Sequence, residues 1–360
     1  MKILIFNWRD LKHKQGGGAE LYLHEQAKRW AKKGNEVLWI TSSVKNEPPI
    51  EVIDRIKFIR KGGIASLYFF AAINYFRYGK NAEAIIDAEN GIPFFTPLYS
   101  RKKKILLIHH VHKDQWFKQW GFPINWIGYF LETKIMPLIY KKTRIVTVSQ
   151  SSKENIKKLL PKNKIEIVYN AISKKYKPGK KSENPEIIFL GRLKKYKSID
   201  VLLKAVSLYD KNLKVNIIGR GDDEERLKNL TKKLKLKKVV FHGFVSEKKK
   251  IKLLQKSWIA VNPSMIEGWS ITNIEANACD LPVIGSNVPG IKDSVIDGKT
   301  GFLFKYGDYK ELAGKIRTLL KNKKLREKMG KEAVKWSKNF SWDKSAEKFL
   351  KIIKKELKEK

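Results

Sequence analysis

Two glutamates near residue 270 have the type and spacing of groups that bind a phosphorylated sugar. Glu267 lies in a glycine-containing turn after an apolar run that ends at Pro263, and Glu275 follows eight residues later. We expect a helix to begin at Ser270–Thr272 and to carry Glu275 in its first turn. Carboxylates accept hydrogen bonds from hydroxyl groups, and the N–H groups at a helix N-terminus attract phosphate. This stretch therefore predicts a site for a nucleotide-sugar.

A structural role for Glu275 is also open. Thr272 and Glu275 have the spacing of a capping box, in which the glutamate would only satisfy N–H groups at the helix end.

Three of the six histidines lie within four positions. His109, His110 and His112 come at the end of an expected strand, where doubly wound sheets bind their ligands. His-x-x-His can bind a metal, but the sequence offers no second ligand pair and no Asp-x-Asp motif for a nucleotide-bound cation. We therefore expect neither a metal nor a cofactor.

The glutamate pair and its surroundings resemble the signature of retaining glycosyltransferases of family four (glycosyl transferases group 1), which have the GT-B fold. That signature is a Glu, seven residues, a second Glu, an Ala-rich helix and a Pro-Val-Ile strand. Here it reads Glu267, Glu275 and then Leu281–Ile284. Upstream, Gly191–Leu193 and Lys197 extend the resemblance, which covers the second half of the chain tightly and the first half loosely.

The resemblance implies a role for each catalytic candidate. Arg192 and Lys197 would stabilise the negative charge that builds on the leaving diphosphate. Glu275 would bind the ribose hydroxyls, Glu267 would face the donor sugar, and His109 would lie near the reacting sugar. Without an obvious nucleophile, the expected mechanism is front-face and retaining, and the leaving phosphate assists deprotonation of the acceptor.

The resemblance also implies a larger donor site and an acceptor side. His110 and His112 are the acceptor-side candidates. The donor-binding candidates are Gly17, Gly18, Gly191, Arg192, Lys197, Gly219, Phe244, Glu267, Gly268, Trp269, Ser270, Ile271, Thr272 and Glu275. The sequence departs from the family pattern at Ser198 and Asp280, where glycine is usual, and at Ser270 and Thr272, where glycine and proline are common.

The expected fold class is α/β, with two Rossmann-like doubly wound domains facing a central cleft. Apolar runs alternate with helical patterns in both halves. We expect an acceptor-side domain over residues 1–170, a nucleotide-sugar domain over 171–340 and a C-terminal helix over 341–360 that returns to the first domain. The polar segment Asn170–Pro185 is expected to be the linker. The expected strands are Lys2–Phe6, Val37–Thr41, Lys57–Ile59, Ala84–Asp87, Lys104–His109, Arg144–Val148, Glu166–Tyr169, Glu186–Leu190, Lys214–Ile218, Val239–His242, Trp258–Val261 and Leu281–Gly285.

The composition bears on partners and location. The formal net charge is +40, but the lysines are spread along all 360 residues and arginine is scarce, which disfavours a specific nucleic-acid site. One cysteine, Cys279, excludes an intramolecular disulfide and suits a reducing cytosol. No signal peptide is visible, and the uncharged stretches Gly62–Phe76 and Gln119–Leu131 are shorter than the roughly 20 residues of a membrane span.

Two aromatic stretches have two interpretations. Ile64–Tyr78 and Trp116–Lys142 combine aromatic residues with lysines or arginines, as in helices that lie on an anionic membrane surface. Alternatively, their aromatic residues fill the core of the first domain.

We expect a retaining, metal-independent glycosyltransferase. It would move a sugar from a UDP- or GDP-sugar to a hydroxyl acceptor, a lipid-linked sugar or surface glycan, at the inner membrane face. A nucleotide-sugar epimerase on the same fold and a basic nucleic-acid-binding protein without catalysis are the alternatives.

Overall fold

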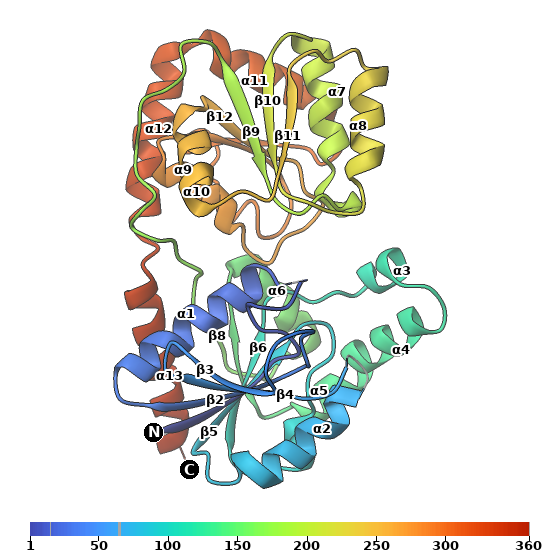
Figure 1. Cartoon of the computed structure of the whole chain (residues 1–360), viewed down its shortest axis with the longest axis vertical. Coiled ribbons are helices and arrows are strands. Elements are labelled where there is room, and N and C mark those ends of the chain that lie inside the picture. The colour runs from blue at the N-terminus through green and yellow to red at the C-terminus, as the bar shows by residue number, and fades with distance from the viewer. Residues whose placement is uncertain (15, 64–65, 360) are drawn as a thin grey trace. The chain divides into compact units, whose positions relative to one another are not determined.

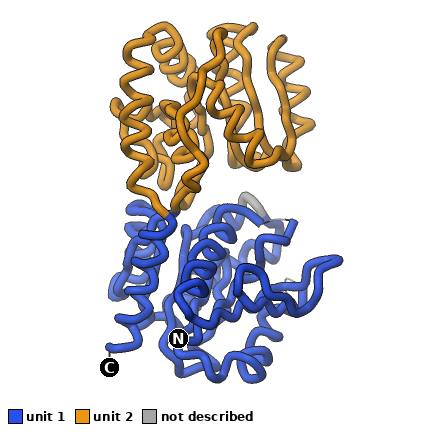
Figure 2. The backbone as a smooth tube through the Cα atoms, turned by 60° about the vertical axis from the view of Figure 1, so that its left-hand side comes forward, with its two compact units in different colours: residues 1–170, 342–360 blue, residues 171–341 orange. Residues whose placement is uncertain are grey.

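The protein divides into two compact units. A computed structural model describes residues 1–14, 16–63 and 66–359. Unit 1 comprises residues 1–170 and 342–360, and unit 2 comprises residues 171–341 (Figure 2).

Unit 1 is built on an eight-stranded sheet with the order β3-β4-β2-β1-β5-β6-β7-β8 (Figure 1). Every pair of neighbours is parallel except β3 and β4. In the central strand β1 the four residues after Lys2 are apolar and buried, because helices cover both faces of a parallel sheet. The strands are β1 (Lys2–Phe6), β2 (Glu36–Thr41), β3 (Ile50–Ile53), β4 (Ile56–Arg60), β5 (Ala84–Glu89), β6 (Lys103–Ile108), β7 (Arg144–Thr147) and β8 (Ile165–Ile167).

The helical segments of unit 1 connect these strands. They are α1 (Gly18–Lys32), α2 (Ser66–Asn74), the π-helix η1 (Tyr75–Gly79), the 3₁₀ turn η2 (Thr96–Leu98), α3 (Gln115–Gln119), α4 (Ile124–Phe130), the π-helix η3 (Leu131–Ile135), α5 (Met136–Ile139), α6 (Gln150–Leu159) and α13 (Trp342–Lys358).

The C-terminal helix α13 packs on α1 within unit 1. The ring of Phe349 meets Trp30 edge-on at 5.1 Å, and the Trp30 indole N–H donates to the Ala346 carbonyl at 3.1 Å. Both aromatic side chains are fully buried. The last helix of the chain therefore completes the core of unit 1.

Unit 2 is built on a six-stranded, entirely parallel sheet with the order β11-β10-β9-β12-β13-β14. Its strands are β9 (Glu186–Leu190), β10 (Lys214–Ile218), β11 (Val239–Gly243), β12 (Ile259–Asn262), β13 (Val283–Ser286) and β14 (Gly301–Phe304). Its helical segments are η4 (Lys195–Lys197, 3₁₀), α7 (Ile199–Tyr209), α8 (Glu224–Lys233), α9 (Glu247–Lys256), α10 (Ile271–Ala278), α11 (Tyr309–Lys321) and α12 (Lys323–Ser337).

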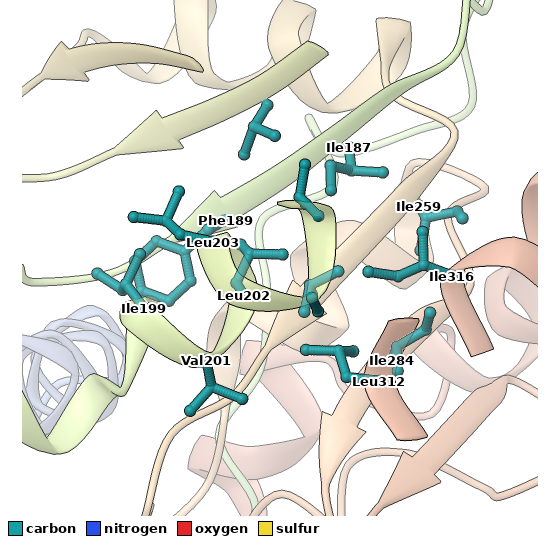
Figure 3. Packing of buried hydrophobic residues seen from close by; sticks show 14 of the residues in the cluster. Ile187, Phe189, Ile199, Val201, Leu202, Leu203, Ile259, Ile284, Leu312 and Ile316 are labelled. Carbon is teal, nitrogen blue, oxygen red and sulfur yellow. The ribbon is translucent and has the colours of Figure 1, made fainter. Parts of the chain in front are cut away.

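A separate apolar cluster covers each face of the unit 2 sheet. Ile187 and Phe189 of β9 point into one cluster, which includes residues of α7 and α11 (Figure 3). Ile188 and Leu190 point into the other. This alternation follows from the two-residue period of a strand, and it leaves the strand ends and their loops free to carry polar groups.

Three expectations from the sequence need correction. Residues 170–185 are not a free linker, because Tyr176 is buried and the Ser182 N–H donates to the Lys256 carbonyl within unit 2. The strands β3 and β14 were not predicted. Both are four residues long, and β3 is an edge strand in which Glu51 interrupts the apolar residues, so it forms no apolar run.

The aromatic stretches of unit 1 divide between core and surface. Trp116 is buried, whereas Phe122 is 83% and Trp126 is 58% exposed. Within the stretch Ile64–Tyr78, residues 64 and 65 lie outside the described residues, and Phe69 is 69% exposed. No helix in the described ranges is long and apolar enough to span a membrane.

Candidate functional site

The turn that carries Glu267 is fixed by a buried network of polar side chains before α10. The Asn262 amide donates to Ser270 Oγ and to Asn273 Oδ1, both at 2.9 Å. Ser270 is the N-cap of α10, and its Oγ accepts from the Asn273 N–H. The capping-box interpretation of Glu275 is therefore wrong, because the helix starts at Ile271 and Glu275 lies in its second turn.

Lys197 and Glu267 form an ion pair within unit 2. Lys197 Nζ donates to Glu267 Oε1, and Ser264 Oγ donates to the same oxygen at 3.3 Å. The two paired side chains are 12% and 17% exposed. Burial is the largest single effect and lowers the pKa of Lys197, but the Glu267 charge, Tyr196 and the hydrogen bond to Glu267 together outweigh it, so the net pKa is raised. Lys197 is therefore a fixed, protonated cation beside the turn at Glu267.

Glycines bring two strand-to-helix turns of unit 2 into backbone contact. A Cβ atom on Gly219, whose φ is +138°, would lie 1.8 Å from the Gly191 carbonyl oxygen.

Ser198, where the family usually has glycine, has a left-handed φ of 49°, and its Oγ lies 3.0 Å from the Tyr306 hydroxyl. Asp280, the other departure, also has a left-handed φ of 63°.

Glu275 lies among polar partners that the sequence did not reveal. Its Oε1 accepts from Lys250 Nζ at 2.7 Å, and Lys250 also lies over the Tyr176 ring. Its Oε2 is buried without a hydrogen bond of standard geometry to a described residue. Burial and then the Glu275 charge raise the pKa of Tyr176. Lys250 and Tyr176 come from distant segments, so no local motif could have predicted them.

The remaining donor-site candidates of unit 2 differ in exposure. Arg192 is exposed and donates to the Tyr196 hydroxyl at 2.9 Å. Phe244 is 78% exposed, directly after the end of β11. Trp269 is buried and packs on Phe340, with ring centroids 5.1 Å apart. Gly268, Ile271 and Thr272 lie in the turn and first residues of α10.

The glycine candidates of unit 1 form the start of α1. Gly17 is the N-cap and Gly18 the first residue of the helix. The Gly17 N–H donates to Glu20 Oε2 at 2.7 Å, and Arg9 donates to Glu20 Oε1 at 2.8 Å. The Gly17 N–H is therefore already hydrogen-bonded to a carboxylate of the protein itself, that of Glu20.

His109 is a buried, neutral side chain of unit 1. It directly follows β6, and its ring lies edge-on to the Tyr22 ring at 5.2 Å. Burial, and to a lesser extent the nearby Arg9 charge, lowers the pKa of His109 to about 4. At neutral pH its imidazole can therefore donate one hydrogen bond and accept another, but it carries no charge.

His110 and His112 lie beside two buried glutamates. Their rings are 4.5 Å apart, and His112 Nδ1 lies 3.4 Å from Glu132 Oε1 and 3.9 Å from Glu89 Oε1. Burial and the Glu132 charge raise the pKa of Glu89 well above its ordinary value. This cluster could not be predicted from the sequence, because Glu89 and Glu132 lie 23 and 20 residues from His112.

The side chains of unit 2 are suited to bind a negatively charged ligand that carries several hydroxyl groups. Lys197 and Arg192 supply positive charge, Glu267 and Glu275 supply acceptors for hydroxyl groups, and the N-terminus of α10 supplies N–H groups. The histidines and the Gly17 turn belong to unit 1.

Two family descriptions match the chain. Residues 171–336 match Glycosyl transferases group 1, and residues 16–175 match Glycosyltransferase Family 4.

Individual relatives agree with these matches. An uncharacterized glycosyltransferase of Methanocaldococcus jannaschii is 32% identical over 72% of this chain and 70% of its own length. The capsular polysaccharide biosynthesis glycosyltransferase CapM of Staphylococcus aureus is 30% identical over 53% of this chain and 50% of its own.

Solved structures share the fold at low identity. Sucrose-phosphate synthase from Thermosynechococcus elongatus has a TM-score of 0.84 at 17% identity and covers 98% of both chains. Anabaena HepE in complex with UDP and glucose has a TM-score of 0.78 at 16% identity, over 99% of this chain and 100% of its own. The chain therefore belongs to the family-four glycosyltransferases and has their GT-B fold of two α/β units.

Proposed function

We propose that this glycosyltransferase moves a sugar from a UDP- or GDP-sugar to a hydroxyl acceptor with retention of the anomeric configuration. The observation that carries the proposal is the Lys197–Glu267 ion pair beside the start of α10. It places the protonated side chain of Lys197 beside the turn that carries Glu267. That turn offers a carboxylate, which accepts hydrogen bonds from sugar hydroxyls, and it leads into the N–H groups at the start of α10. The UDP and glucose named for the HepE structure support a nucleotide-sugar donor.

The donor diphosphate is the group that Lys197 and Arg192 would bind. Negative charge builds on this leaving group as the glycosidic bond breaks, and two fixed cations stabilise it more than they stabilise the ground state. Because Arg192 is exposed and Lys197 is protonated, both can provide this charge without a metal at the diphosphate.

The two glutamates would hold the rest of the donor. Glu275, whose Oε1 pairs with Lys250 beside Tyr176, would accept a ribose hydroxyl through its carboxylate. Glu267 would turn its carboxylate to the donor sugar when the diphosphate draws Lys197 away. Phe244, exposed after β11, would meet the base.

His109 would contact the reacting sugar in its neutral form. A pKa of about 4 leaves it uncharged at pH 7, so it would act through a hydrogen bond. The acceptor hydroxyl would then lose its proton to the leaving phosphate.

The acceptor that the surface of unit 1 favours is a lipid-linked sugar or surface glycan. Phe122, Trp126 and Phe130 are each more than half exposed around α4, and Lys141 and Lys142 are exposed a few residues further on. Aromatic and basic side chains together bind an anionic membrane surface. The role of CapM in capsular polysaccharide biosynthesis supports a glycan acceptor.

Turnover with defined donors tests the proposal. The protein is incubated with UDP- and GDP-sugars and membrane lipid extract, and the anomeric configuration of the product is read by proton NMR. We expect transfer from one nucleotide class with retained configuration, and added Mg²⁺ or Mn²⁺ should change nucleotide affinity by less than about twofold. An inverted product would contradict retention, and a changed sugar without transfer would instead establish an epimerase.

A further inference from the structure

Two buried glutamates of unit 1 lack the basic partner that the other buried glutamates have. Among the described residues, Glu20 pairs with Arg9, Glu186 with Lys214 and Glu275 with Lys250. By contrast, Glu89 and Glu132, which are 1% and 0% exposed, have His112 as their one basic neighbour within 4.0 Å in the described ranges. This is unusual in a chain with 76 lysines and arginines.

A buried carboxylate without compensation is costly. Glu132 is partly compensated, because its two oxygens accept from the N–H groups of His112 at 2.6 Å and Lys113 at 2.7 Å, and from Trp116 Nε1 at 3.2 Å. Glu89 has fewer compensating hydrogen bonds. Its Oε1 accepts from the Gly91 N–H, and its Oε2 is buried with no hydrogen-bond partner in the part of the chain that the structure describes.

The imidazole of His112 presents a second buried atom without a hydrogen bond. His112 Nδ1 has no partner of standard hydrogen-bond geometry among the described residues, although both carboxylates surround it. One ligand atom from each of Glu89, His112 and Glu132 lies within 4.8 Å of the others. Three different segments supply these atoms: the end of β5, the loop after β6, and η3 (Figure 1).

These separations suit a bound metal better than direct hydrogen bonds. Two ligands of a tetrahedral zinc ion at roughly 2.0–2.2 Å are themselves about 3.3–3.5 Å apart. His112 Nδ1 and Glu132 Oε1 are 3.4 Å apart, and His112 Nδ1 and Glu89 Oε1 are 3.9 Å apart. The first separation matches that of two zinc ligands, the second exceeds it by roughly half an ångström, and the ligand atoms of the two carboxylates lie within 4.8 Å of each other.

We propose that Glu89, His112 and Glu132 bind a divalent transition metal ion. The ion would neutralise the two buried carboxylates and tie together the segments after β5 and β6 and the helical segment η3. The loop that it fixes begins at His109. The three residues belong to unit 1, and the ion's role would be to hold this loop in place.

The ligand set favours zinc over the alkaline-earth ions. Ca²⁺ and Mg²⁺ prefer ligand sets made of oxygen only, and an imidazole with two carboxylates suits Zn²⁺, Mn²⁺ or Fe²⁺. Among these ions, affinity for a site of nitrogen and oxygen ligands is highest for Zn²⁺. Zn²⁺ is therefore the probe to use.

Zinc titration of the metal-free protein tests the proposal. The full chain is stripped with a chelator, and binding of Zn²⁺ is followed by calorimetry and by the melting temperature. We expect one Zn²⁺ per chain, a higher melting temperature with Zn²⁺, and no comparable rise with Ca²⁺ or Mg²⁺. Glu89→Gln and His112→Gln should each weaken binding at least tenfold, whereas His13→Gln, a histidine of the same unit outside the cluster, should bind as the wild type does.

The stability of metal-free Glu89→Gln gives an independent readout. Without zinc this variant should melt no lower than the wild type, because the substitution removes a buried charge. Failure of the wild type to bind one Zn²⁺, or equal binding by Glu89→Gln and His112→Gln, would overturn the proposal. Neither result depends on sugar transfer, so the donor site of unit 2 is tested separately.

Discussion

Cys279, the one cysteine of the chain, provides a direct test of burial at the residue scale. Its side chain is fully buried behind α10, and burial raises the pKa of its thiol to about 12. Because the thiolate is the reactive form, a chromogenic disulfide reagent should not label the native protein at pH 8. It should label one thiol per chain in denaturant. Rapid labelling of the native protein would show that the site opens.

His109 should make the stability of unit 1 depend on pH. Its folded pKa of about 4 lies below the ordinary 6.5, so the unfolded state binds more protons between these values and stability falls as the pH falls. The full difference corresponds to about 3 kcal/mol. Urea unfolding at pH 7.5 and pH 4.5 should therefore show a smaller pH-dependent loss for His109→Gln than for the wild type. Equal losses would contradict a buried neutral imidazole.

At the scale of elements, two glycines of unit 2 should respond in opposite directions to alanine. Gly219 has a positive φ and no room for a Cβ beside the Gly191 carbonyl, so Gly219→Ala should cost about 2–4 kcal/mol. Gly314 lies in α11, is exposed, and has no atom within 4 Å of an added Cβ. Gly314→Ala should therefore stabilise the protein by about 0.5–1 kcal/mol.

Chemical unfolding of the two variants checks this pair. A Gly219→Ala protein as stable as the wild type would show that the two turns are not in contact as described.

The sequence predicted the long, apolar elements and missed the short ones. Strand β9 was predicted with its observed bounds because four apolar residues follow Glu186, and the C-terminal helix, expected over 341–360 from the family pattern, is observed over Trp342–Lys358. Strand β3 was missed because it has only four residues and Glu51 interrupts its apolar side chains, and residues 170–185 were misjudged because a polar segment can still bury one large residue, Tyr176.

Candidate site residues were predictable only where neighbours in sequence are neighbours in space. The turn from Glu267 to Ser270 is local, so its motif was visible. The partners of Glu275 and His112 come from segments 20 or more residues away, and a single sequence holds no record of such contacts.

At the scale of the whole molecule, membrane binding should depend on aromatic side chains and not on charge alone. A net charge of +40 already attracts anionic vesicles, so the informative variant leaves charge unchanged. Phe122→Ser with Trp126→Ser removes two exposed aromatic side chains around α4 and should weaken partitioning at least tenfold in vesicle sedimentation at physiological salt.

Leu208→Ser is the matched control, because Leu208 is a 57% exposed apolar residue of unit 2. If the Phe122→Ser, Trp126→Ser double variant and Leu208→Ser both sediment with vesicles as the wild type does, membrane binding is purely electrostatic.

The most direct test of the central claim is calorimetric binding of UDP and GDP to the wild type, Lys197→Ala and Glu275→Gln. Lys299→Ala, which removes an exposed lysine of unit 2, controls for net charge. We predict that one nucleotide binds the wild type and Lys299→Ala within about twofold. A charge-assisted hydrogen bond contributes about 1.5–3 kcal/mol, so Lys197→Ala should bind roughly 10–100-fold more weakly. Glu275→Gln should lose at least part of that affinity. Unchanged binding by both site variants would contradict a donor site at Lys197 and Glu275.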